Sequence, residues 1–210
     1  MIDNSNINNT DDLEFIDLSQ KGNEKKDSQT FNNFKKLNRR RRFIKNLYIY
    51  IIIILSAVAI AFIINRFVII NAHVPTESME TTISANDKLI GFRLAYLFKD
   101  PERGDIIIFK FPDDESQIFI KRIIGIPGDK VEVVEGVLYL NDKPTYETYI
   151  KEKMFGNYGP YYVPDGCYFV MGDNRNVSED SRFWQNTYVK RKQILAKAWF
   201  KYSPGFSKIN

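Results

Sequence analysis

The chain has 210 residues, of which 44% are hydrophobic and 27% are charged, and its formal net charge is +4 at pH 7. Domains usually contain roughly 100 to 200 residues, so this length allows one membrane span and one further domain but excludes a second large domain. Much of the basic excess lies at residues 35–45, beside an apolar run, so the charge indicates a membrane surface and not a nucleic-acid partner.

Residues 1–46 are predicted to be a cytoplasmic tail. The first 34 residues are rich in Asn, Asp, Ser and Lys and contain few apolar positions. Because such a composition cannot bury enough apolar surface to fold, this part of the tail is expected to be disordered. The basic residues 35–45 complete the tail.

Residues 47–70 are predicted to form a transmembrane helix. The eighteen uncharged residues LYIYIIIILSAVAIAFII begin it, and as a helix they would rise by about 27 Å, close to the roughly 30 Å of a bilayer core. A cleaved signal peptide is the alternative, but its apolar core has about 7 to 15 residues and lies near the N-terminus. Since the basic residues precede the span, the positive-inside rule predicts a single-pass protein with residues 71–210 outside the cytoplasm.

From Lys88 onward the chain is predicted to be mainly β. Short runs rich in Ile, Val, Phe and Tyr alternate with turn signals such as Pro-Gly-Asp. These runs are KLIGFR, GDIIIFKF, QIFIKRIIGI, DKVEVV, GVLYL, CYFVMG and ILAKAWFKY. Their spacing favours an antiparallel sheet assembly, with a hairpin turning at Glu135-Gly136 and one weakly helical stretch at residues 180–189.

The stretch HVPTESMETTI at residues 73–83, called the serine segment below, follows the span and contains the only histidine. A Ser-His-Asp triad has poor geometry here, because His73 lies only five residues before Ser78. A zinc site is hard to build from one His and one Cys. Cys167 lies in an apolar strand pattern and is expected to be packed and inert, with no internal disulfide.

If Ser78 is a nucleophile, a lysine is the remaining candidate for the base that takes its proton. In QIFIKRIIGIPGD, strand alternation places Lys121 on one face and Arg122 on the other, each among apolar neighbours. Burial can lower a lysine pKa from about 10.4 by as much as 3 to 5 units, which would let Lys121 accept a proton near pH 7. Arg122 stays charged and would need a carboxylate partner. An edge strand with both cations in water is the alternative that spacing alone favours.

A further polar stretch, MGDNRNVSEDSRFW at residues 171–184, is called the C-terminal cluster below. Its Gly, Asp and Asn residues are typical of a turn. Ser178, Asp180, Ser181 and Arg182 add a hydroxyl that could orient an amine and charged groups that could form ion pairs. On its own, such a stretch is more often a polar loop than a site.

Taken together, these stretches resemble the type I signal peptidases of the Ser/Lys class in bacterial membranes. SMETT at residues 78–82 is similar to the family's nucleophile motif, and RGDIIIF at 103–109 to the motif leading into its sheet. KRIIGIPGD at 121–129 resembles its lysine motif, and GDNRNVSEDSR at 172–182 its C-terminal motif. The resemblance implies a mainly β fold, with a single N-terminal transmembrane helix followed by an antiparallel β-sheet catalytic domain.

The resemblance also implies roles for the matching residues. Ser78 would be the nucleophile and Lys121 the general base, and the Thr76 hydroxyl would join the backbone N–H of Ser78 in the oxyanion hole. Supporting residues would be Ser178, which orients the lysine, the pairs Asp180–Arg182 and Arg122–Asp173, and Met79, which shapes the substrate site. No metal or cofactor is implied.

The implied activity is removal of signal peptides from exported preproteins at the outer membrane face, after a small-x-small site such as Ala-x-Ala. Its partners would be those signal peptides and the lipid bilayer, and no oligomeric state is implied. Thr81 and Gln185 stand where the family usually has proline and glycine, which would affect efficiency or substrate preference. The alternatives are a weakly active or inactive paralogue acting as a membrane-anchored binding module, and a self-cleaving Ser/Lys repressor, which the transmembrane run argues against.

Overall fold

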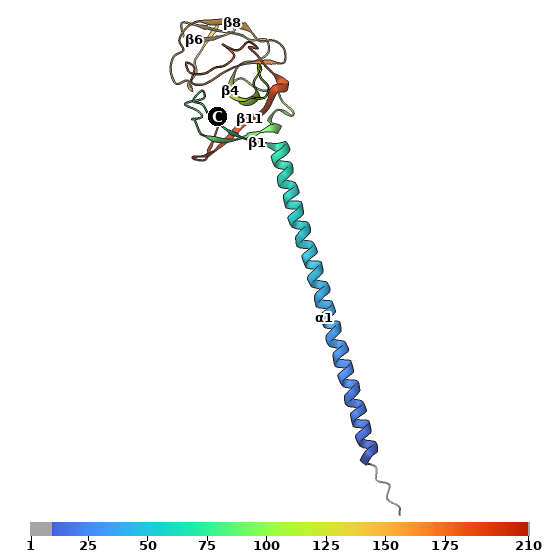
Figure 1. The fold of residues 1–210 in the computed structure, drawn as a ribbon. Helices are drawn as coiled ribbons and strands as arrows, with labels where there is room; N and C mark the ends of the chain where they lie inside the picture. The colour runs from blue at the N-terminus through green and yellow to red at the C-terminus, as the bar shows by residue number, and fades with distance from the viewer. Residues whose placement is uncertain (1–9, 210) are drawn as a thin grey trace, which may run out of the picture. The chain divides into compact units, whose positions relative to one another are not determined.

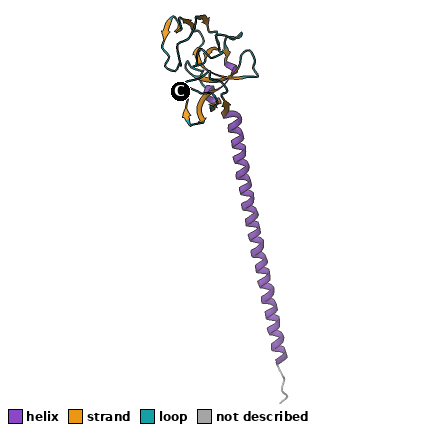
Figure 2. Cartoon of the chain, turned by 60° about the vertical axis from the view of Figure 1, so that its left-hand side comes forward, coloured by secondary structure: helices purple, strands orange, loops and turns teal. Residues whose placement is uncertain are grey.

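The structure is a computed structural model that describes residues 10–209 (Figure 1). By their internal contacts the residues form two units, which divide between Ile60 and Ala61. The first unit is helical, and the second contains the strands (Figure 2).

Helix α1 spans Thr10–Ile63. Its apolar part has no Gly or Pro, and the Ser56 hydroxyl donates to the carbonyl of Ile53 at 2.8 Å, so this polar side chain is satisfied within the helix. The segment Lys35–Val68 is long and apolar enough to cross a membrane by length and composition. An apolar helix was therefore correctly predicted here.

The C-terminal end of the predicted span differs from the prediction. The α-helix ends at Ile63 and continues as a π-helix over Ile64–Val68. Strand β1 then spans Ile69–His73, so the last two residues of the predicted span are extended. Strand β1 pairs with a neighbouring strand, and this pairing satisfies backbone groups that would otherwise continue the helix.

Part of the predicted tail is helical in the structure. Residues 1–9 lie outside the described residues, but residues 10–46 are helical. This stretch contains one glycine and no proline, and extending a helix costs far less than starting one. Helix can therefore propagate from the apolar part toward the N-terminus. The predicted boundaries of tail, span and catalytic domain stay predictions.

The second unit consists of two antiparallel sheets, so the predicted fold class is confirmed. The larger has the order β1-β2-β11-β3-β4-β9-β10 with β12 beside β11; its strands after β1 are β2 Lys88–Phe92, β3 Ile106–Lys110, β4 Ile118–Gly125, β9 Cys167–Met171, β10 Val189–Lys190, β11 Ile194–Ser203 and β12 Ser207–Lys208. The smaller has the order β7-β6-β5-β8; its strands are β5 Lys130–Val134, β6 Val137–Leu140, β7 Lys143–Thr145 and β8 Tyr158–Tyr162. Two 3-10 helices, η2 Arg93–Tyr96 and η3 Arg191–Gln193, connect strands.

Every predicted strand run contains a strand of the structure, namely β2, β3, β4, β5, β6, β9 and β11. The predicted hairpin joins β5 to β6, and its turn residues Glu135 and Gly136 have φ of 49° and 76°. Positive φ at both positions is the backbone of a type I′ turn. The unpredicted strands are short, and β7 and β8 contain proline, which weakens the sequence signal for a strand.

The predicted helical stretch at residues 180–189 is wrong, because these residues form turns that lead into β10. The Asp180 carboxylate accepts a hydrogen bond from the amide of Gly172 at 3.0 Å, and the Ser181 hydroxyl accepts one from the amide of Val170 at 3.0 Å. Side-chain oxygens that bind backbone amides in this way compete with helical hydrogen bonds. These hydrogen bonds hold the stretch against the C-terminal end of β9.

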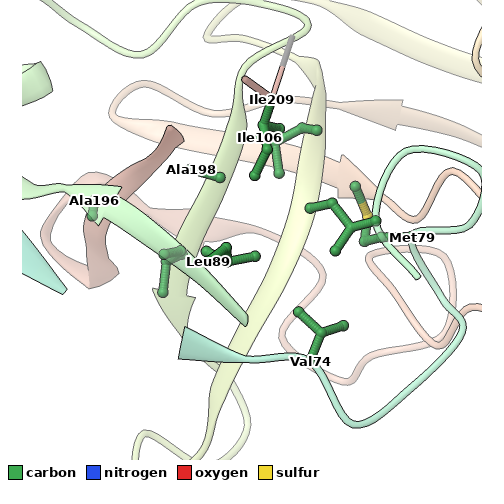
Figure 3. Close-up of a cluster of buried hydrophobic side chains, with 9 residues drawn as sticks. Val74, Met79, Leu89, Ile106, Ala196, Ala198 and Ile209 are labelled. Carbon is green, nitrogen blue, oxygen red and sulfur yellow. The ribbon is translucent and has the colours of Figure 1, made fainter. Parts of the chain in front are cut away.

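Hydrophobic packing attaches the serine segment to the larger sheet. Val74, Met79 and Ile83 are buried and lie in one cluster with residues of β2, β3 and β11 (Figure 3). Burying one such side chain contributes about 1.5 to 3 kcal/mol, so these contacts hold an irregular segment in place. The sheet partners in this cluster are Leu89, Ile106, Ile108, Ala196 and Ala198.

Candidate active site

A cavity of about 360 Å³ opens between the serine segment, β4 and the C-terminal cluster. Ser78 and Lys121 both line it, so the fold brings together two side chains that are 43 residues apart in the sequence. Its other lining residues are mostly apolar: His73, Val74, Pro75, Thr76, Ile118, Phe119, Ile120, Val177 and Glu179.

Turns within the serine segment and hydrogen bonds from Asn174 of the C-terminal cluster fix the position of Ser78. The amide of Ile83 donates to the carbonyl of Met79 at 2.8 Å within the segment. Asn174 makes two further contacts: its amide donates to the carbonyl of Ser78 and its side-chain Nδ2 to the carbonyl of Glu77, each at 3.1 Å. Asn174 was not singled out from the sequence, although it lies in a stretch that was.

The hydroxyl of Ser78 faces a second hydroxyl. The Oγ of Ser78 and the Oγ1 of Thr76 lie 3.3 Å apart. Within residues 10–209 the backbone amide of Ser78 donates no hydrogen bond. An amide and a hydroxyl are therefore both free to donate to a negatively charged oxygen at this end of the cavity.

Lys121 lies in the middle of the larger sheet and not at its edge. Strand β4 pairs with β3 on one side and β9 on the other, and Lys121 is only 4% exposed. The alternative of an edge strand with solvated cations is therefore wrong. Burial lowers the pKa of Lys121 to about 8, against the opposing pull of the Asp180 carboxylate.

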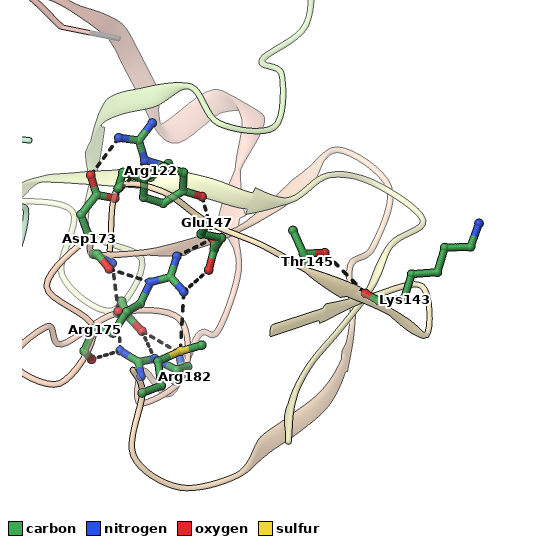
Figure 4. Close-up of polar contacts among 11 residues, drawn as sticks. Arg122, Lys143, Thr145, Glu147, Asp173, Arg175 and Arg182 are labelled. Carbon is green, nitrogen blue, oxygen red and sulfur yellow. Dashed lines mark hydrogen bonds and ion pairs between the residues drawn. The ribbon is translucent and has the colours of Figure 1, made fainter. Parts of the chain in front are cut away.

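Both predicted ion pairs are formed beside this lysine. The Arg122 guanidinium donates to the two carboxylate oxygens of Asp173 at 2.9 and 2.8 Å (Figure 4). The Arg182 guanidinium donates to those of Asp180 at 2.8 and 2.9 Å. Two-point contacts fix orientation as well as distance, so the Arg122–Asp173 pair holds the C-terminal cluster against β4 and the Asp180–Arg182 pair makes the cluster itself rigid.

Ser178 is buried in the same region, but it makes no hydrogen bond to Lys121. Among the described residues its Oγ has no hydrogen-bond partner. Gly172 packs directly against it, since a Cβ at Gly172 would lie 2.3 Å from the Ser178 Oγ and 2.3 Å from the Ser78 carbonyl oxygen. The buried hydroxyl is thus available to an amine, and only a glycine leaves room for it.

Met79 corrects one prediction. Its side chain is fully buried in the hydrophobic cluster under the serine segment, and it is not among the cavity's lining residues. A large apolar residue beside Ser78 anchors the irregular segment to the sheet, where a substrate cannot reach it. Met79 therefore supports the site from below instead of contacting substrate.

A third buried pair was missed entirely. The Arg175 guanidinium donates to both oxygens of Glu147 at 2.5 and 2.6 Å (Figure 4). Tyr149, two residues further, donates to Glu147 at 2.6 Å, and the Arg122 guanidinium lies 3.9 Å from the centre of its ring. Glu147 lies in a long loop without periodicity, so no sequence signal pointed to it.

Replacing Glu147 with glutamine is expected to lower the free energy of unfolding by about 3 to 5 kcal/mol, because the Arg175 cation would stay buried without its carboxylate. Chemical denaturation of the full-length protein in detergent measures this. The matched control is Lys151→Gln, which removes the exposed pair with Glu80 (2.9 Å) and should change stability little. Equal effects of the two substitutions would contradict a structural role for the buried pair.

The two residues that depart from the family pattern, Thr81 and Gln185, each have a defined environment in the structure. Gln185 is not among the described residues with positive φ, so no glycine is needed there. The amides of Gln185 and Asn186 instead donate to the Asp113 carboxylate at 3.0 and 2.7 Å. The Thr81 hydroxyl donates to the Tyr149 carbonyl at 3.2 Å, a contact that proline could not make.

His73 and Cys167 take no part in a catalytic arrangement with Ser78. His73 is exposed at the end of β1, and within residues 10–209 no hydrogen bond joins it to Ser78. Cys167 is half-buried on β9, outside the cavity, and burial raises the pKa of its thiol. A raised pKa keeps a thiol protonated and unreactive.

Comparisons with known proteins find several similar chains. The family model described as signal peptidase, peptidase S26, matches residues 47–203. The probable signal peptidase I-2 of Synechocystis sp. is 42% identical over 154 residues, 71% of this chain and 70% of the relative. The signal peptidase I of Leptolyngbya laminosa is 39% identical over 155 residues, 70% of this chain and 75% of the relative. A crystal structure of a signal peptidase I from Enterococcus faecalis is 33% identical, with 47% of this chain and 97% of that chain covered and a TM-score of 0.42.

The protein is a hydrolase. Its mainly antiparallel β unit has a serine at a cavity, and the chain is similar to signal peptidases. The chain belongs to the signal peptidase family, peptidase S26, and is a serine endopeptidase. The predicted family is thereby confirmed. Because the match begins at residue 47, it includes the apolar segment, which argues further against a soluble self-cleaving repressor.

Proposed function

We propose that this endopeptidase removes N-terminal signal peptides from exported preproteins by cutting after a small-x-small site such as Ala-x-Ala, with Ser78 as nucleophile and Lys121 as general base. The observation that carries the proposal is the cavity shared by the two side chains in a chain of this family. With a pKa of about 8 for Lys121, about one lysine in ten is neutral at pH 7, as a general base requires.

In the first half of the reaction, the Oγ of Ser78 attacks the carbonyl carbon of the scissile bond and its proton passes to the neutral Nζ of Lys121. The amide of Ser78 and the hydroxyl of Thr76 stabilise the resulting oxyanion. Lys121 then gives its proton to the leaving nitrogen, and the mature protein departs with a new N-terminus. The signal peptide stays on Ser78 as an ester.

In the second half, the neutral Lys121 takes a proton from a water molecule whose oxygen attacks the ester. Collapse of the intermediate releases the signal peptide as a carboxylic acid, which loses its proton to water, and Lys121 returns its own proton to Ser78. The buried hydroxyl of Ser178 has no partner among the described residues, so it is available to bind and orient the Nζ of Lys121 during the reaction. The Arg122–Asp173 and Asp180–Arg182 pairs keep this framework rigid.

The apolar segment supports a membrane anchor. Its large side chains are exposed along α1, for example Ile54 at 62% and Phe62 at 66%, and exposed apolar surface of this extent needs a lipid environment. By the positive-inside rule, the basic residues 35–45 support a single-pass topology with the N-terminus in the cytoplasm and residues 71–210 outside it. A shared bilayer raises the effective concentration of signal peptides at the site.

Incubating the full-length protein in detergent with a preprotein, and mapping the products by mass spectrometry, tests the proposal. We expect one cut after a small-x-small site with the wild type, none with Ser78→Ala, and a normal cut with Ser84→Ala, which removes an exposed hydroxyl from the next turn. Absence of any cut by folded wild-type protein would favour the second candidate, a weakly active or inactive paralogue that serves as a membrane-anchored binding module.

Replacing Thr76 with valine is expected to lower kcat by about 10²- to 10³-fold with little change in KM, because one donor to the oxyanion is lost while the shape is kept. The control is Thr76→Ser, which keeps the hydroxyl and should retain most activity. Steady-state kinetics with a signal-peptide substrate measure both. Similar kcat values for the valine and serine variants would show that the Thr76 hydroxyl does not stabilise the oxyanion.

A further inference from the structure

One charged residue in the cavity has no part in the mechanism above. Glu179 lines the cavity together with Ser78 and Lys121, and its side chain is exposed to solvent. It lies between the buried residues Ser178 and Asp180, so the backbone around it is fixed. Within residues 10–209 its carboxylate forms no hydrogen bond and no ion pair. Its carboxylate is therefore free to pair directly with a basic group of a bound peptide.

The other residues that line the cavity include no second carboxylate and are mainly apolar. The cavity's titratable residues are His73, Lys121 and Glu179, and the rest of its wall is mainly apolar. When Lys121 is neutral and ready to act as a base, Glu179 supplies the only carboxylate among the lining residues. The apolar walls offer a bound peptide no competing acidic partner, so a basic side chain that reaches this cavity meets Glu179.

We infer that Glu179 is a specificity-determining residue that favours substrates with a basic side chain near the cleavage site and disfavours those with an acidic one. This inference rests on the proposed function, because it concerns peptides bound in the same cavity. A cation beside Glu179 gains a partner without the cost of breaking another ion pair. An acidic side chain at the same place would meet a like charge.

The same carboxylate also acts on Lys121. The charged groups that influence the lysine are Asp180, Arg182, Asp173 and Glu179, and His73 is a further titratable residue of the cavity lining. The negative charge of Glu179 raises the pKa of Lys121 and so opposes the lowering by burial. A basic substrate side chain that neutralises Glu179 would release the lysine into its neutral form. Substrate charge and base strength are therefore coupled.

The test uses signal-peptide substrates that differ only in one residue, Lys, Gln or Glu, placed in turn at each position flanking the small-x-small site. With the full-length wild type in detergent, at least one position should show a kcat/KM about tenfold higher for Lys than for Glu. The ratio should fall to about one in Glu179→Gln and should invert in Glu179→Lys. The control Glu135→Gln removes an exposed carboxylate at the β5–β6 turn, and its ratio should equal that of the wild type.

The pH dependence of kcat provides a second measurement. With the wild type, the rise of kcat with pH should occur at lower pH for the Lys peptide than for the Gln peptide. In Glu179→Gln, kcat should rise at the same pH for both peptides. A Lys-to-Glu ratio that is unchanged by Glu179→Gln, or no charge preference at any position, overturns the inference while leaving the proposed function intact. Failure of the wild type to cut any of the peptides overturns both.

Discussion

Replacing Lys121 with arginine is expected to lower the rate of signal-peptide cleavage by at least about 10⁴-fold, although the side chain stays long and basic. A guanidinium with a pKa above about 12 keeps its proton, so it cannot accept the one from Ser78. Lys121→Ala should lose as much activity, because it also removes the base. If the arginine variant were active, the base would have to be sought elsewhere.

The pH profile of the wild type separates loss of the base from loss of the fold. The pKa of Lys121 is about 8 because burial disfavours its charged form. The base works when deprotonated, so kcat/KM should rise with pH through this value, and at pH 6 only about one lysine in a hundred is neutral. The control Lys110→Arg changes a half-exposed lysine at the end of β3 and should keep both rate and profile. A wild-type rate that is flat from pH 6 to 9 would contradict a lysine base.

The central strand shows what sequence could predict about this site. The alternation in QIFIKRIIGI correctly put Lys121 and Arg122 on opposite faces, because residues in a strand alternate whatever their surroundings. Spacing could not say whether β4 lies at an edge or in the centre, since strand order depends on pairings with residues far along the chain. The pairing with β3 and β9 decides this, and it is what buries the lysine.

The buried ion pairs around the site could be predicted only where both partners lie in motifs of the family. Asp173 and Asp180 lie in the C-terminal cluster, and the structure pairs each with its expected arginine. Glu147 comes from a loop after β7 that has no periodicity, and its distance of 28 residues from Arg175 carries no signal. The role expected of Met79 came from the family resemblance alone, and in the structure its side chain packs in the hydrophobic cluster under the serine segment.

Replacing Gly172 with alanine is expected to lower kcat by about 10²-fold or more, since a misplacement of about 1 Å at reacting groups has effects of this size. The added Cβ would lie 2.3 Å from the Ser178 Oγ, 2.6 Å from the Ser178 Cβ and 2.3 Å from the Ser78 carbonyl oxygen. Real Cβ contacts do not occur below 3.0 Å, so these groups must move. One of them is backbone of Ser78, and its displacement shifts the nucleophile itself.

This requirement for glycine comes from space and not from backbone angles, because Gly172 is not among the described glycines with positive φ. The matched control is Gly205→Ala, whose Cβ would meet nothing within 4 Å, and its kcat should stay within about twofold of the wild type. Kinetics and denaturation of both variants in detergent distinguish a shifted site from an unfolded one. A Gly172→Ala variant with normal kcat would mean that the contact between the C-terminal cluster and Ser78 does not position the nucleophile. A folded variant with low kcat would show that catalysis depends on how closely these two segments, almost a hundred residues apart in the sequence, pack together.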